Sequence, residues 1–196
     1  MESIRPPKEE KEVTTAYNCV DDLTEEEYKN FGDRFPVNFV KAALLGRGGF
    51  SLVWLGIQRK TKKRLAIKQI LTKNPHQTHL KEIWFGNYFF TAGGEPREEF
   101  ADHIGVRNIC RLLAYDIRPV DTWLFYELCE DSLGNSLYEL RSDHSSGEDR
   151  SYTVFYKPLL FRFREDPTEL KHLLVELCKT LMLLNAHNIV HSDLKT

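Results

Sequence analysis

The chain contains 196 residues, of which 41% are hydrophobic and 29% charged, and its formal net charge at pH 7 is -2. A chain of this length and composition can bury one or two hydrophobic cores. The near balance of charge argues against a nucleic-acid surface driven by bulk positive charge, so we expect no nucleic-acid partner.

Cysteine spacing and the pattern of apolar residues indicate the cellular compartment in which the protein acts. The four cysteines lie far apart with no C-x-x-C pair, so we expect neither a disulfide framework nor a metal cage. No apolar stretch approaches the roughly 20 residues of a membrane span. The opening MESIRPPKEEKE has no apolar signal core. We therefore expect a soluble intracellular protein, cytoplasmic or nuclear, with no membrane partner. The oligomeric state stays open.

The first third of the chain predicts an extension followed by three strands. Residues 1–34 are charged and poor in apolar side chains, which favours a mobile extension. Residues 39–45, 51–58 and 64–70 then form three apolar runs typical of strands. The first two runs are separated by a glycine-rich turn, and the last two by a basic turn.

The glycine-rich turn has a chemical use. Gly46, Gly48 and Gly49 leave the backbone free to adopt a positive φ and to approach a ligand closely. Backbone N–H groups in such a turn point into one concavity, which suits phosphate oxygens. The alternative is an ordinary β-hairpin with a flexible loop.

A lysine lies inside the third apolar run. In a strand, Ala66 and Lys68 share one face, whereas Leu65 and Ile67 share the other. A buried ammonium without a partner would cost several kcal/mol, so we expect a negative group beside Lys68.

The middle of the chain predicts a helix and two more strands. Residues 78–90 have helical spacing and contain Glu82, whose alternative role is a solvated helix carboxylate. Residues 91–108 form a long connection between this helix and the next strand, which we treat as an insertion of unknown purpose. The runs 109–117 and 122–128 would complete a five-stranded sheet.

The last third predicts a loop-rich segment and a long helix. Residues 141–166 open with a loop composition and continue with an aromatic run that forms a small hairpin or a cover. Asp166 can cap the next helix, and Glu169 can close a capping box. Leucines then follow at helical spacing and predict a core face: Leu170, Leu173, Leu174, Leu177, Leu181 and Leu184.

Taken in order, these motifs resemble the eukaryotic protein kinase family. The sequence G-x-G-x-x-S-x-V, from Gly46 to Val53, precedes A-I-K ending at Lys68, and is similar to the family's G-x-G-x-x-G-x-V and V-A-I-K. Ser51 replaces the third glycine. IVHSDLK near the end of the chain resembles the catalytic loop I-V-H-R-D-L-K, with Ser192 in place of the arginine that commonly docks a phosphorylated activation loop.

The resemblance implies an α+β, protein-kinase-like fold. A five-stranded antiparallel N-lobe sheet with one helix would occupy residues 35–128. The hinge and an incomplete helical C-lobe would occupy residues 129–196. The implied activity is phosphoryl transfer from ATP to a serine or threonine hydroxyl of a protein substrate, with Mg as the second cofactor.

The resemblance also implies residue roles. Lys68 would pair with Glu82 and hold the α and β phosphates. Asp193 would orient the acceptor hydroxyl, and Lys195 would touch the transferring phosphate, as in serine/threonine kinases. Tyr126 would be the gatekeeper. The implied nucleotide-binding residues are Leu45, Gly46, Arg47, Gly48, Gly49, Phe50, Ser51, Val53, Ala66, Lys68, Tyr126, Glu127 and Cys129.

Three functions stay open. The first is an active kinase, and the second is a pseudokinase or scaffold that binds nucleotide or partners without catalysis. The third is a non-kinase interaction module with a coincidental glycine loop. Both magnesium ligands of the family would follow Thr196, so we expect the 196-residue chain alone not to transfer phosphate at a useful rate.

Overall fold

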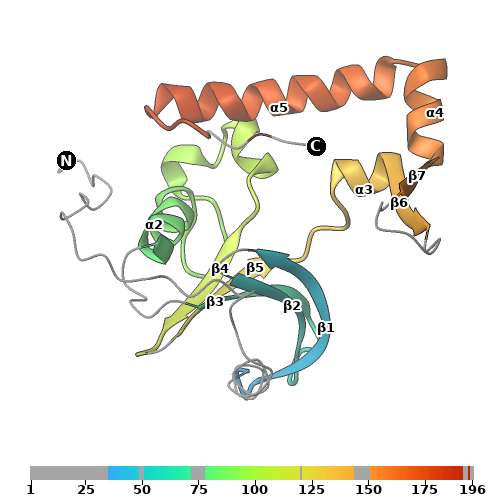
Figure 1. Cartoon of the computed structure of the whole chain (residues 1–196). Helices are drawn as coiled ribbons and strands as arrows, with labels where there is room; N and C mark the ends of the chain where they lie inside the picture. Colours follow the sequence, from blue (N-terminus) through green and yellow to red (C-terminus); the bar gives the residue numbers. More distant parts are fainter. Residues whose placement is uncertain are drawn as a thin grey trace, which may run out of the picture. The chain divides into compact units, whose positions relative to one another are not determined.

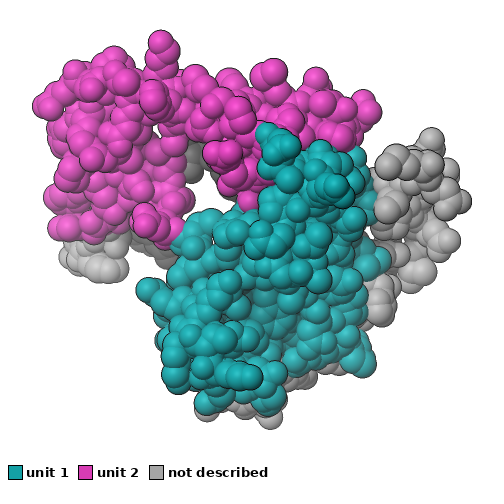
Figure 2. All heavy atoms as spheres, turned by 180° about the vertical axis from the view of Figure 1, so that it is seen from behind, with its two compact units in different colours: residues 1–102, 110–129 teal, residues 103–109, 130–196 magenta. Residues whose placement is uncertain are grey.

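The computed structural model describes residues 35–48, 51–71, 78–119, 121–143, 151–191 and 194. The chain divides into two compact units, coloured separately in Figure 2. The first unit contains residues 1–102 and 110–129, and the second contains residues 103–109 and 130–196. Among the described helices, none is long and apolar enough to span a membrane.

The first unit is built on a five-stranded antiparallel sheet (Figure 1). The strand order is β1-β2-β3-β5-β4, and neighbours in this order are antiparallel. The chain therefore has the α+β class and the sheet that the sequence predicts. The strands are β1 (Phe39–Gly48), β2 (Ser51–Gln58), β3 (Arg64–Leu71), β4 (Leu112–Ile117) and β5 (Asp121–Glu127).

The two faces of this sheet bury different clusters. One cluster contains Leu65 and Ile67, as the alternation along β3 predicts, packed with Trp123 and Phe125 of β5. Trp123 is fully buried and makes an edge-to-face contact with Phe35, with ring centroids 5.5 Å apart. Alternating residues of a strand point to opposite faces, so Ala66 and Lys68 are left for the other side.

The helix α2 (Thr78–Phe89) covers this other side (Figure 1). Ile83 of α2 packs in a cluster with Ile70, Leu112 and Leu124. A Cβ atom added at Gly86 would lie 2.5 Å from Cβ of Leu112, closer than side chains approach one another. Gly86 therefore allows α2 to lie directly on β4, and the space that an apolar side chain would fill is already taken by Leu112.

The predicted insertion, residues 91–108, contains two short 3-10 helices. In the first unit, Gly93 and Gly94 have φ values of 99° and 89°, which only glycine adopts without strain. They precede η2 (Glu98–Phe100), whose Phe100 is buried. The second helix, η3 (Ile104–Asn108), belongs to the second unit.

The second unit combines a hairpin with helices. Of the two alternatives left open for residues 141–166, the small hairpin is observed, formed by β6 and β7. A short helix precedes the hairpin, and two more follow it. These elements are α3 (Leu133–Leu137), β6 (Tyr138–Asp143), β7 (Ser151–Tyr156), α4 (Pro158–Glu165) and α5 (Thr168–Ala186).

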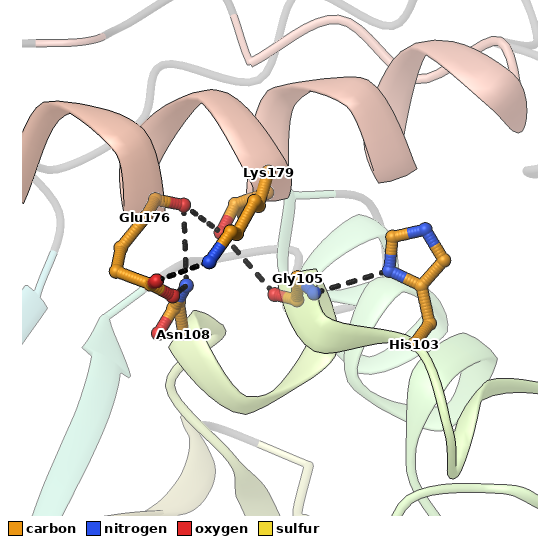
Figure 3. A network of polar contacts seen from close by, with 6 residues as sticks. His103, Gly105, Asn108, Glu176 and Lys179 are labelled. Atoms are coloured by element: carbon orange, nitrogen blue, oxygen red, sulfur yellow. Dashed lines mark hydrogen bonds and ion pairs between the residues drawn. The ribbon is translucent and has the colours of Figure 1, made fainter. Parts of the chain in front are cut away.

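The helix η3 is fastened to α5 (Figure 3). A Cβ atom added at Gly105 would lie 2.5 Å from the carbonyl oxygen of Lys179, so only glycine permits this approach. The hydroxyl of Thr180 donates to the carbonyl of Gly105 at 3.2 Å. The amide of Asn108 donates to the carbonyl and to Oε2 of Glu176, both at 3.1 Å. The end of the predicted insertion, η3, therefore packs against α5 within the second unit.

Two expectations for α5 are wrong. Leu184 is buried, but Leu173, Leu174 and Leu177 are 40%, 50% and 39% exposed, because η3 reaches only part of the helix. The helix start also differs. Pro167, not Asp166, occupies the N-cap position and makes no side-chain capping hydrogen bond, although Asp166 accepts the N–H of Thr168 at 2.9 Å.

The capping box itself is not formed. The backbone N–H of Asp166 donates to the carbonyl of Arg162 at 2.8 Å, so it is already paired. The carboxylate of Glu169 contacts the guanidinium of Arg162 instead, at 3.2 Å.

Candidate functional site

The glycine-rich segment forms the end of the β1–β2 hairpin. Gly46 lies opposite Val53, and Gly48 lies opposite Ser51, so β1 runs three residues further than the predicted strand. The register is irregular between Leu44 and Gly46. Neither Gly46 nor Gly48 has a positive φ, contrary to the expectation, because both are extended strand residues. Gly49 and Phe50 lie outside the described residues.

Gly46 and Gly48 have no side chain to cover the backbone of this hairpin. A Cβ atom added at Gly46 would meet no other heavy atom within 4 Å. At Gly48 the nearest atom would be Oγ of Ser51, at 3.2 Å. Internal packing therefore does not require glycine at position 46, whereas close approach of a ligand to the backbone would.

Lys68 and Glu82 form an ion pair between the sheet and α2. Nζ of Lys68 lies 2.7 Å from Oε1 and 2.9 Å from Oε2 of Glu82. The side chains are 26% and 37% exposed, so the pair is reached by solvent. An ammonium has three N–H donors, and a carboxylate that takes two of them leaves a third for another anion.

Tyr126 of β5 adds a second donor to the same carboxylate. Its hydroxyl donates to Oε2 of Glu82 at 3.1 Å. Burial, followed by the charge of Glu82 and the hydrogen bond to it, raises the pKa of Tyr126 far above its ordinary value. The phenol therefore remains a protonated donor, and Glu82 receives hydrogen bonds from β3 and β5 at once.

The strand register brings several predicted nucleotide-binding residues into one neighbourhood. Val53 lies opposite Lys68 across β2 and β3. Ala66 lies opposite Tyr126 across β3 and β5. Glu127 ends β5, and Cys129 follows it. Three strands thus contribute adjacent residues to the sheet face that carries the ion pair.

A pocket of about 230 Å³ adjoins the ion pair within the first unit. Lys68, Glu82 and Tyr126 form a carboxylate cluster, and the pocket wall includes two of its members, Glu82 and Tyr126. Gly86, at which α2 contacts β4, also lines the pocket. The lining residues are Lys81, Glu82, Phe85, Gly86, Cys110 and Tyr126.

The end of β5 is held by a contact that the sequence did not predict. The backbone N–H of Arg111 donates to Oε1 of Glu127 at 2.9 Å, and its guanidinium donates to Oε2 at 2.8 Å. The backbone N–H of Glu127 donates to the carbonyl of Arg111 at 3.1 Å. Glu127 is therefore held by main chain and side chain, which orients its own carbonyl. A basic residue before β4 gave no local signal of this pairing.

The predicted catalytic-loop residues belong to a segment that the structure does not fully describe. Ser192, Asp193 and Lys195 lie outside the described residues. Of the predicted nucleotide-binding residues, Leu45 and Arg47 lie on β1. In the described ranges, no three His, Cys, Asp or Glu side chains converge as metal ligands. The ammonium of Lys68 and the open backbone at Gly46 fit a phosphate-bearing ligand such as ATP.

The chain was also compared with known proteins. No family model matches it, and no curated protein does either.

Proposed function

We propose that the chain carries the nucleotide-binding part of an ATP-dependent protein serine/threonine kinase. The observation that carries this proposal is the contact of Lys68 with both carboxylate oxygens of Glu82, at 2.7 and 2.9 Å. A strand lysine oriented by a helix carboxylate, one strand away from a glycine-rich hairpin, is the arrangement that kinases use on ATP phosphates.

Each described residue then has a physical task. Glu82 fixes the ammonium of Lys68 so that its remaining N–H donor is directed at phosphate oxygens. The backbone at Gly46 offers close approach without a Cβ atom in the way. Arg111 fixes Glu127, whose carbonyl is the acceptor expected for the adenine amino group.

The catalytic roles lie in the last residues of the chain. Asp193 would orient the acceptor hydroxyl, and Lys195 would contact the transferring phosphate. Bound magnesium would neutralise charge on the phosphates during transfer. Positioning matters more here than a strong base, because the transition state of phosphoryl transfer is loose.

Nucleotide binding is tested by the thermal stability of the chain with and without magnesium ATP. Ligand present at 100 times its Kd stabilises a protein by about 2.7 kcal/mol, which is a shift of several degrees. We expect such a shift for the unchanged chain and none for Lys68→Met. The matched control is Lys63→Met, in the exposed turn before β3, which should retain the shift.

Two results would contradict the proposal. One is the absence of any shift of the unchanged chain at millimolar ATP. The other is an equal shift in Lys68→Met, which would place the nucleotide elsewhere.

The residues encoded after Thr196 distinguish an active kinase from a pseudokinase. An asparagine two positions past Thr196, followed later by D-F-G, supports catalysis because these residues hold magnesium. Loss of both supports a scaffold. With both present, Asp193→Asn should abolish phosphate transfer while leaving the ATP-induced thermal shift unchanged.

A further inference from the structure

Two cysteines that are far apart in sequence meet at the edge of the first unit. Sγ of Cys129 lies 3.8 Å from Sγ of Cys110, although 19 positions separate them. Both residues are exposed and both thiols are free. Cysteine spacing along the chain gave no sign of this pair, because the β4–β5 hairpin lies between its members.

The hairpin fixes this approach. Cys110 precedes β4 by two residues, and Cys129 follows β5 by two. Arg111, which lies between Cys110 and β4, makes backbone and side-chain hydrogen bonds of 2.8 to 3.1 Å with Glu127, the last residue of β5. These bonds hold the two chain segments in register, so the sulfurs stay near one another while the hairpin is folded.

The pair also lies where the chain enters and leaves the first unit. Residues 110–129 form one continuous piece of that unit, and the two cysteines are its end residues. A covalent link between them would close this piece into a loop. The link would tie the residue before Arg111 to the first residue of the predicted hinge region.

We propose that Cys110 and Cys129 form a thiol–disulfide modification site, oxidised by a small disulfide such as glutathione disulfide. The proposal stands on the approach of the two sulfurs and on the exposure of the residue Cys129, whose thiol reacts first, and it does not depend on nucleotide binding.

The reaction proceeds by two thiol–disulfide exchanges. Cys110 is exposed as a residue, but desolvation of its sulfur, followed by the nearby Cys129, raises the pKa of its thiol to about 12, so this thiol is largely protonated at neutral pH. The thiolate of Cys129 attacks glutathione disulfide, and one glutathione leaves. Cys110 then loses its proton to water and attacks the sulfur of Cys129, and the second glutathione leaves. Two electrons and two thiol hydrogens thus pass to glutathione disulfide, giving two glutathiones.

The modification would act on the end of β5. Sγ of Cys110 lies 3.9 Å from the carbonyl oxygen of Glu127 and also lines the pocket beside Glu82. Oxidation removes the S–H that faces this carbonyl. The local consequence is a changed environment for Glu127 and for one wall of the pocket.

The test is equilibration of the full chain with glutathione redox buffers, followed by mass spectrometry. A Cys19→Ser/Cys178→Ser background leaves only the proposed pair. We expect a product lighter by two hydrogens, with a peptide linking Cys110 to Cys129. The same equilibration in concentrated urea shows whether the folded structure favours the disulfide. We expect the equilibrium constant for oxidation of the cysteine pair by glutathione disulfide, the oxidation constant, to be at least about tenfold lower in urea.

The single variants Cys110→Ser and Cys129→Ser serve as controls. Each should give only a mixed disulfide with glutathione, and no product lighter by two hydrogens. Two results would overturn the proposal: two glutathione adducts on the folded chain in place of the internal disulfide, or an oxidation constant equal in buffer and in urea. Either would mean that the fold does not bring the two sulfurs together for reaction.

Discussion

The first unit buries side chains on both faces of its sheet, whereas the second buries little of its longest helix. Leu52, Ile67, Trp123 and Leu124 are fully buried in the first unit. In the second unit, the apolar face of α5 is half-exposed over most of its length and buried only near its C-terminal end. Burial of apolar area stabilises by about 25 cal/mol per Å², so similar leucines have different energetic weight in the two units.

We expect the largest effect on the free energy of unfolding from one member of a matched pair of leucine-to-alanine substitutions. Leu52→Ala removes a side chain with no exposed surface and should cost about 2–5 kcal/mol. Leu174→Ala removes a side chain that is 50% exposed, and it should change stability by no more than about 0.5 kcal/mol. Urea unfolding followed by tryptophan fluorescence measures the first, since all three tryptophans lie in the first unit. Far-UV circular dichroism measures the second.

Equal costs for the two truncations would contradict the comparison. They would mean that α5 is covered in solution as completely as the sheet core.

The next effect tests the contact that fastens η3 to α5. Gly105→Ala should destabilise the second unit by about 1–3 kcal/mol, because the new Cβ atom meets backbone and cannot be accommodated by rotation of a side chain. Amide hydrogen exchange along α5 measures this loss. Gly46→Ala is the control, with no neighbour within 4 Å of the new atom, and should leave stability within about 0.5 kcal/mol.

A smaller effect tests the carboxylate cluster. Tyr126→Phe removes the hydroxyl that donates to Glu82 and should cost about 0.5–1.5 kcal/mol. Combined with Lys68→Met, it should show a coupling energy of at least about 0.5 kcal/mol, since both groups contact one carboxylate. Tyr115→Phe, at an exposed tyrosine of β4, is the matched control and should show no coupling. Strict additivity of Tyr126→Phe and Lys68→Met would mean that the cluster is not an energetic unit.

The smallest effect is the pH dependence of the second unit. Hydrogen bonds from Lys179 and Asn108 lower the pKa of Glu176 below its ordinary value of 4.5. Its stabilisation is therefore present above pH 4.5 and is lost as the pH falls through the lowered folded-state pKa. Hydrogen exchange along α5 should show this acid loss in the unchanged chain and less of it in Glu176→Gln. An identical acid profile in both proteins would contradict the assignment.

Sequence patterns predicted the elements of the first unit well, because each strand is decided by local alternation. β2 has the predicted bounds, and α2 ends one residue early. β1 continues through Gly48 because Gly46 and Gly48 pair with residues of β2. The glycine-rich composition had predicted a turn at these positions instead. Propensity at these glycines was overridden by strand pairing.

Contacts between distant segments could not be predicted in this way. The exposure of Leu173 and Leu174 depends on what covers α5, and helical spacing states only which residues share a face. The fit of Gly105 against Lys179 and the approach of Cys110 to Cys129 depend on how separate segments meet. Of the candidate site, the Lys68–Glu82 pair was predicted, but the hydroxyl of Tyr126 was not.

We propose that the ammonium of Lys68 and the β1–β2 hairpin bind the phosphates of ATP. Titration of the isotope-labelled chain with magnesium ATP, followed by amide chemical shifts, tests it most directly. We expect the largest amide shifts at Gly46, Gly48, Lys68 and Glu127, and we expect Lys68→Met to abolish them. Shifts confined to the second unit, or unchanged by Lys68→Met, would contradict it.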